Sequence, residues 1–416
     1  MKDLLLITPP FTQLNTPYPA TAYLKGFLNT KNISSYQIDL GIEVILEIFS
    51  KKGVTEIFNV KPENLSENAQ RIFALKEEYI KTIDEVIAFL QNKKPTLARQ
   101  ICSMNFLPEA SRFNQLDDME YAFGNMGLQD KAKHLATLYL EDLSDYIIEN
   151  IDENFGFSRY AERLGRSANS FDELYEKLQS EKTFVDNFTV EILDKKLLET
   201  KPKLVCFSVP FPGNLYSAFR CAQYIKNHYP NIKTAFGGGF ANTELRDLKD
   251  KRVFEFFDFI TLDDGELPIE LLFENVCHSE QSEASLFKRT FLLENGEVVY
   301  KNNSERHDYK QAEIGTPDYT DLPLDQYISV IEIANPMHSL WSDGRWNKLT
   351  MAHGCYWGKC TFCDISLDYI KIYEPIAAKI LVDRMEELIE KTGENGFHFV
   401  DEAAPPALMR EVALEI

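Results

Sequence analysis

Segments of strand length alternate with amphipathic segments along most of the chain. Strand-like runs, each followed by proline, glycine, aspartate or another turn residue, occur at 3–8, 35–40, 204–209, 233–236 and 257–262. Apolar residues at three- and four-residue spacing, which is typical of helices packed on one side, follow at 20–29, 215–228 and 267–276. Strands that alternate with helices predict an α/β fold with a doubly wound, Rossmann-like parallel sheet over residues 1–275.

A long segment interrupts this alternation between the second and third predicted strands. Residues 60–200 show helical periodicity and almost no strand pattern. We therefore expect a large helical insertion within the first domain, whose apolar stripes serve as helix-packing surfaces.

A linker and a second unit are expected after the first domain. The linker, 276–328, contains a predicted β-hairpin at 290–300 with an Asn295-Gly296 turn. The second unit, 329–416, begins with Ser329-Val-Ile-Glu-Ile333 and then has the predicted order strand, cysteine loop, helix, strand, with the strands at 348–352 and 396–401 and the helix at 376–392. This order predicts one βα unit and part of another.

Composition narrows the classes of partner. The formal net charge of −21 argues against a nucleic-acid surface, because phosphate backbones are held by clusters of Lys and Arg. No apolar run approaches the ~20 residues that span a bilayer, and the first ten residues lack the features of a signal peptide. We expect a cytoplasmic protein without a membrane span.

Three cysteines stand close together in the sequence His353-Gly-Cys-Tyr-Trp-Gly-Lys-Cys-Thr-Phe-Cys-Asp364. Thiolates are the soft ligands that an iron–sulfur cluster requires, and Cys355, Cys360 and Cys363 would hold three corners of a cubane. One iron would stay open to a further ligand. The alternatives are a structural zinc site completed by His353, a cluster used only for electron transfer, and uncoordinated thiols. The other four cysteines are expected to be small buried hydrophobic residues: Cys102, Cys206, Cys221 and Cys277.

The cysteine loop and the strand after it resemble the opening of a radical S-adenosylmethionine (SAM) enzyme, over roughly 330–416. The usual family spacing is C-x3-C-x2-C, and this chain has one extra residue before Cys360. The resemblance implies a 4Fe-4S cluster on the three cysteines, SAM on the open iron, an external electron donor and a small-molecule substrate. It also implies that Phe362 packs beside adenine and that Asp401 and Glu402 lie near the methionine amine.

Turn residues follow the predicted strands of the first domain, at the sheet edge where doubly wound folds bind ligands. They are Pro9, Pro10, Ser208, Val209, Pro210, Gly237, Gly238, Gly239, Asp264, Gly265 and Glu266. This domain resembles the cobalamin-binding module often fused ahead of radical SAM domains, which implies cobalamin at these turns and a methyltransferase. No Asp-x-His-x-x-Gly follows the first strand, so an axial histidine is not expected. The alternatives are ordinary turns of a flavodoxin-like sheet, or a substrate-binding or docking module without cobalamin.

The length of chain after the cysteines bears on activity. Only residues 364–416 follow Cys363, whereas a βα unit of a barrel takes about 30 residues. We therefore expect a chain that ends within the radical SAM domain and is inactive alone, although its parent is an enzyme. Sheet edges left open in this way favour dimers.

Overall fold

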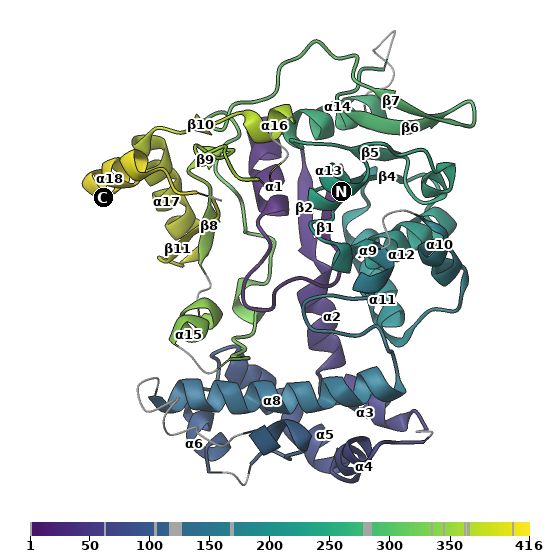
Figure 1. Ribbon diagram of the computed structural model, residues 1–416, viewed down its shortest axis with the longest axis vertical. Helices are drawn as coiled ribbons and strands as arrows, with labels where there is room; N and C mark the ends of the chain where they lie inside the picture. The colour runs from purple at the N-terminus through teal and green to yellow at the C-terminus, as the bar shows by residue number, and fades with distance from the viewer. Residues whose placement is uncertain are drawn as a thin grey trace.

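A seven-stranded sheet forms the centre of the molecule (Figure 1). The computed structural model describes residues 2–61, 64–103, 106–115, 127–166, 170–277, 285–333, 336–343, 346–361, 363, 367–401 and 403–416. The strand order is β2-β1-β3-β4-β5-β6-β7, and β1 to β5 are parallel to one another. The strands are β1 (Leu4–Thr8), β2 (Ser35–Asp39), β3 (Leu204–Ser208), β4 (Lys233–Gly237), β5 (Phe259–Thr261), β6 (Thr290–Glu294) and β7 (Glu297–Lys301). The predicted α/β fold with a largely parallel sheet is confirmed.

The predicted hairpin belongs to this same sheet. Strand β6 pairs antiparallel with β5, and β7 pairs antiparallel with β6. Asn295 and Gly296 both have positive φ, 53° and 79°, as the two central residues of a type I′ turn require. The hairpin therefore extends the sheet as its antiparallel edge.

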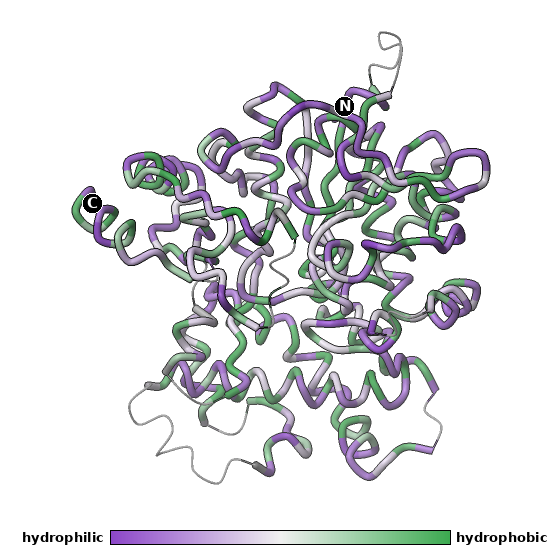
Figure 2. Tube along the Cα trace, turned by 45° about the horizontal axis from the view of Figure 1, so that its top comes forward, coloured by the Kyte–Doolittle hydropathy of each residue, from purple (hydrophilic) through white to green (hydrophobic). Residues whose placement is uncertain are grey.

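Alternate side chains of the strands enter two separate cores. Leu5 and Ile7 point to one face, and Leu4 and Leu6 point to the other, because successive side chains of a strand alternate. Helices α2 (Leu40–Ile48), α11 (Phe184–Thr200), α12 (Pro212–His228) and α13 (Gly239–Glu244) cover the first face. Helices α1 (Ala20–Thr30) and α14 (Glu266–Cys277) cover the second. Hydrophobic residues concentrate along the central strands, and hydrophilic residues along much of the periphery (Figure 2).

Helices fill the segment between β2 and β3, and several of them form the lower layer in Figure 1. Besides α2 and α11 they are α3 (Lys51–Asn59), α4 (Glu67–Ala74), α5 (Lys76–Leu90), α6 (Ala98–Ile101), α8 (Gly127–Asn150), α9 (Glu162–Arg166) and α10 (Asp172–Gln179). Phe11, in the loop after β1, packs edge-on against Phe155 and Tyr160, with ring centroids 5.9 Å apart in both pairs. The insertion thus contacts the loop after β1. Across the described ranges, every helix is too short or too polar to span a membrane.

The C-terminal unit has a small core of its own. Strand β8 (Asn347–Leu349) pairs parallel with β11 (Phe397–Phe399), and β9 (Ala352–His353) pairs antiparallel with β10 (Glu374–Pro375). Its helices are α15 (Pro336–Asp343), α16 (Asp368–Lys371), α17 (Ala378–Thr392) and α18 (Pro406–Glu415). Leu349, Met351, Leu381 and Leu388 are buried together. The parallel pair β8 and β11, joined through α17, is a βαβ arrangement.

Residues 329–333, with which the second unit is expected to begin, contact the helical insertion. This segment pairs with no strand among the described residues; instead, the amide of Ser329 donates to the carbonyl of Leu90 at 2.8 Å. The amide of Ile331 donates to Oγ1 of Thr137 at 2.9 Å. Helices α5 and α8 thus supply hydrogen-bond partners to this segment.

Candidate functional site

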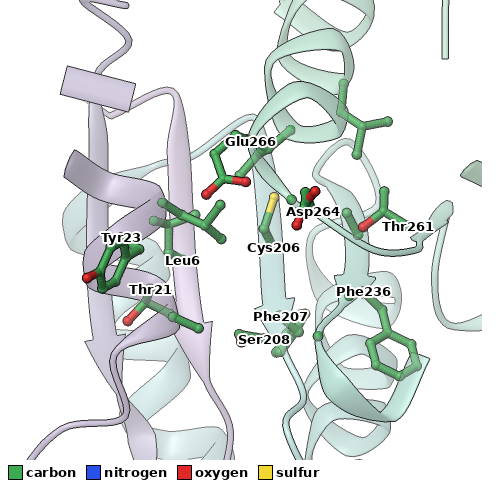
Figure 3. Close-up of a pocket in the computed structure, with 18 of the residues that line it drawn as sticks. Leu6, Thr21, Tyr23, Cys206, Phe207, Ser208, Phe236, Thr261, Asp264 and Glu266 are labelled. Atoms are coloured by element: carbon green, nitrogen blue, oxygen red, sulfur yellow. The ribbon is translucent and has the colours of Figure 1, made fainter. Parts of the chain in front are cut away.

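A cavity of about 260 Å³ lies beside the central strands, under α1 and α14. Strand β1 has β2 on one side and β3 on the other, so the chain reverses its direction of winding at this point, where ligands bind in open α/β sheets. Figure 3 shows side chains from β1, β3, α1 and the start of α14 around this space. The residues that line the cavity are Leu6, Ala20, Thr21, Tyr23, Leu24, Cys206, Phe207, Ser208, Ala235, Phe236, Gly237, Gly238, Thr261, Asp263, Asp264, Gly265, Glu266, Ile269 and Leu272.

The structure brings about half of the predicted edge residues into this cavity. Those that line it are Ser208, Gly237, Gly238, Asp264, Gly265 and Glu266. Those that do not are Pro9, Pro10, Val209, Pro210 and Gly239. Pro9 and Pro10 are buried, and the Pro9 carbonyl accepts a hydrogen bond from Nδ2 of Asn214, in α12, at 2.8 Å.

Sequence reasoning missed the contribution of α1 and the strand interiors. Thr21 and Tyr23 lie in the first turns of α1, and Cys206 lies in the middle of β3. The sequence did contain a signal for Thr21. It is a polar residue at the start of the helix predicted after the first strand, and the start of such a helix lies at the same sheet edge as the end of the strand. The expected burial of the four scattered cysteines holds for Cys206 and Cys221, whereas Cys102 and Cys277 are partly exposed.

The glycines after β4 are explained by a backbone contact. A Cβ on Gly238, whose φ is +104°, would lie 2.8 Å from the carbonyl oxygen of Val209. The amide of Phe240 donates to that same oxygen at 3.1 Å, and the amide of Val209 donates to the carbonyl of Gly237 at 2.8 Å. The glycines thus permit two loops of the protein to approach each other, rather than leaving room for a flat cofactor.

Replacing Gly238 with alanine is expected to lower the free energy of unfolding by about 2–4 kcal/mol. Alanine is strained at the positive φ of this position, and its Cβ would also clash with the carbonyl oxygen of Val209. Gly296→Ala is the matched control: it has φ +79° but no atom within 4 Å of the new Cβ, so a loss of about 1 kcal/mol is expected. Urea unfolding measures both. Equal losses in the two variants would contradict the contact with Val209.

Carboxylates line one end of the cavity, and one of them is well neutralised. Asp263 pairs with Arg246, and its other oxygen lies 3.6 Å from Nε of Arg289. Arg289 in turn holds Asp308 through two hydrogen bonds of 2.7 and 2.8 Å. Each arginine is therefore already engaged by a carboxylate.

Glu266 is the carboxylate without such a partner. Among the described residues no cation forms a salt bridge with it and no other side chain hydrogen-bonds to it; Arg289 is near enough to lower its pKa, and its own backbone amide donates a hydrogen bond to it. Burial and the neighbouring Asp264 raise the pKa of Glu266 to about 7. In Figure 3 its carboxylate points into the gap between Leu6 and Cys206. A group at this position can bind a cation or exchange a proton near neutral pH.

The segment that carries the cysteines begins at the acidic end of the cavity. Nε2 of His353, two residues before Cys355, lies 3.0 Å from Oδ1 of Asp264. The guanidinium of Arg246 lies over the ring of Tyr369, 5.3 Å from its centroid. In Figure 1, α16 accordingly sits beside α14 and α1. The chain on both sides of the cysteines is thus held against the ligand edge of the sheet.

The three predicted metal ligands lie on this segment, but the structure does not draw them together. Cys355, Cys360 and Cys363 are partly exposed and form no disulfide. In the part of the chain that is described, no three His, Cys, Asp or Glu side chains are close enough to hold a metal ion. The donor set still suits a cluster, since three accessible thiols share one loop. Phe362 lies outside the described residues, so its packing stays a prediction.

Asp401 is engaged by the backbone that precedes the cysteines. Its carboxylate accepts hydrogen bonds from the amide of Met351, at 3.0 and 2.9 Å, and from the amide of Ala352, at 2.9 Å. The described geometry thus gives Asp401 a positioning role for β9, and contact with the methionine amine of SAM stays a prediction. Glu402 lies outside the described residues.

Asp401→Ala is expected to lower the free energy of unfolding by about 1–3 kcal/mol, because two buried amides lose a charged acceptor. Hydrogen exchange at Met351 and Ala352 should accelerate more than exchange elsewhere in the C-terminal unit. Asp401→Asn is the matched control, since its amide oxygen still accepts one of the bonds. Unchanged exchange at both amides in the alanine variant would rule out this role.

Comparison with known proteins gives no relative to guide the assignment. No protein-family model matches the chain. No curated protein matches it significantly either. The proposals below therefore rest on the residues, the geometry of the site and the resemblance of the cysteine loop.

Proposed function

We propose that this chain is part of a radical SAM enzyme, in which the cysteine loop works beside a ligand held at the edge of the central sheet. The contact between His353 and Asp264 carries the proposal, because it fixes the start of the cysteine loop at the mouth of the cavity. Thr350 strengthens this placement: its amide donates to Oη of Tyr23, which lines the cavity, at 2.7 Å. A reactive centre on the loop would face the bound ligand.

The chain supplies the residues that such chemistry needs. Cys355, Cys360 and Cys363 would hold a 4Fe-4S cluster, which when bound supplies the electron that cleaves the sulfonium C–S bond of SAM to give a 5′-deoxyadenosyl radical. The protein itself would orient the reacting groups and exclude side reactions. Asp401 fixes the strand before the loop, and Asp264 holds the loop's first residues against the sheet.

Anaerobic reconstitution with iron and sulfide tests the proposal. The purified chain is expected to take up about four iron and four sulfide per molecule and to give the optical and EPR spectra of a 4Fe-4S cluster. Addition of SAM should change the EPR spectrum, because SAM would coordinate the open iron. Binding of zinc alone, or a cluster whose spectrum SAM leaves unchanged, would refute the assignment.

Cobalamin in the first domain is the second candidate, favoured by the cavity's place at the reversal of strand order. The residues described do not fit it well. The volume of about 260 Å³ lies near the lower limit for drug-sized ligands, about 300 Å³, and a corrin with its nucleotide tail is much larger. No histidine is among the described residues that line the cavity. We therefore favour a substrate-binding module in the first domain.

Gel filtration separates these two hypotheses. Hydroxocobalamin mixed with the protein is expected to pass through a desalting column unbound, as a substrate-binding module predicts. A corrin absorption band that stays with the protein would restore the methyltransferase hypothesis.

A further inference from the structure

Most of the cavity wall is apolar and buried. Leu6, Cys206, Ala235, Ile269 and Leu272 all belong to the core between the sheet and the helices α1 and α14. Such a wall accepts a hydrocarbon or aromatic body, and the burial of that body would supply most of the binding free energy.

The charge at the acidic end of this wall is not balanced. Arg246 and Arg289 face Asp263, and Arg289 is also tied to Asp308, so the two arginines have carboxylate partners. Asp264 has the imidazole of His353. Glu266 forms no salt bridge in the described part of the chain, since Arg289 acts on it without contact, and its carboxylate points into the cavity (Figure 3).

A second polar group on the wall also lacks a partner. Thr21 is 1% exposed, and its hydroxyl has no hydrogen-bond partner among the described residues. A buried hydroxyl without a hydrogen bond costs free energy unless a ligand or a water molecule supplies that hydrogen bond. The cavity therefore offers a carboxylate without a salt bridge and a hydroxyl without a hydrogen bond beside its apolar wall.

We propose that this cavity binds a small molecule that carries a protonated amine on an apolar body, with the amine at Glu266. An ammonium group would donate a charge-assisted hydrogen bond to the carboxylate of Glu266 and balance its charge. The apolar body would lie against Leu6, Ile269 and Leu272. A polar atom of the ligand would reach the hydroxyl of Thr21. This inference deepens the proposed function, because it names the ligand class of the same cavity.

Three matched probes test the ligand class without iron or SAM: 2-phenylethylamine, 2-phenylethanol and 3-phenylpropionate. They share an aromatic body and differ in the group at its end. Calorimetry at pH 8, above the pKa of about 7 at which Glu266 ionises, measures their affinities. The amine is expected to bind about tenfold more tightly than the alcohol, and the carboxylate to bind least. Equal affinity of amine and alcohol would overturn the proposal.

Variants locate the binding. Glu266→Gln keeps the shape of the side chain and removes its charge, so amine affinity should fall about tenfold while alcohol affinity stays within about twofold. Glu297→Gln is the matched control, because the side chain of Glu297 is exposed on β7, and it should leave both affinities unchanged. Cys206→Leu fills part of the cavity and should weaken all three probes.

Amine binding that survives Glu266→Gln unchanged would refute the site. Thermal melting of each variant separates loss of fold from loss of binding. Because no step uses iron, failure here leaves cluster reconstitution on Cys355, Cys360 and Cys363 as an independent result, and failure of that reconstitution leaves the amine site standing.

Discussion

Replacing Cys355, Cys360 and Cys363 together with alanine is expected to abolish iron and sulfide uptake, from about four atoms of each per chain to none. Three thiolates are the ligands that the loop offers, and a cubane loses all of its protein ligands when they are removed. Metal analysis and the optical spectrum after anaerobic reconstitution measure the change. Each single alanine variant should lower occupancy and make the cluster labile, because two thiolates still bind iron weakly.

Two further variants show whether the cysteine loop alone holds the iron. Changing Cys102 and Cys277 to alanine removes two partly exposed thiols outside the loop, and iron uptake should be unchanged. His353→Ala separates a cluster from zinc: a cluster on three cysteines should retain its iron, whereas a site with three cysteines and one histidine would lose its metal. Full iron uptake by the triple variant would place the metal elsewhere.

The second large effect concerns a buried ion pair between Asp186 of the insertion and Arg220 of α12. Nε of Arg220 lies 2.9 Å from Oδ2 of Asp186, and the two side chains are 3% and 2% exposed. Arg220 also donates to the carbonyl of Leu178 at 3.0 Å and to Oη of Tyr216 at 2.8 Å. It thereby joins α10, α11 and α12. Burial raises the pKa of Asp186, so this carboxylate depends on its partner.

Arg220→Met is expected to lower the free energy of unfolding by about 3–5 kcal/mol, because it leaves the buried carboxylate of Asp186 without its cation. Urea unfolding, followed by circular dichroism, measures the loss. The double variant with Asp186→Leu should recover part of it, since neither charge is then buried alone.

A surface pair provides the control for Arg220→Met. Nη2 of Arg166 lies 2.9 Å from Oε1 of Glu162, but the arginine is 66% exposed. Arg166→Met should therefore cost less than about 1 kcal/mol. A similarly small loss in Arg220→Met would show that the insertion does not depend on this ion pair.

The order of strands and helices could be predicted from the sequence because it depends on local patterns. Buried parallel strands need short apolar runs, and Leu4 to Thr8 and Leu204 to Ser208 show them clearly. Asn295-Gly296 predicts its hairpin for a similar reason, since both residues tolerate positive φ. At 329–333 the local pattern does not show what packs against the segment, and its hydrogen bonds to Leu90 and Thr137 place it against α5 and α8.

The sequence by itself determined the α/β alternation, the hairpin turn and the spacing of three thiols on one loop, because each is set by residues within a few positions of one another. Only the tertiary structure decided that Asp401 holds the backbone at Met351, that Gly238 meets Val209, and that His353 reaches Asp264. These contacts join segments far apart in the chain. They depend on how the two cores pack against α1, and no local pattern encodes that packing.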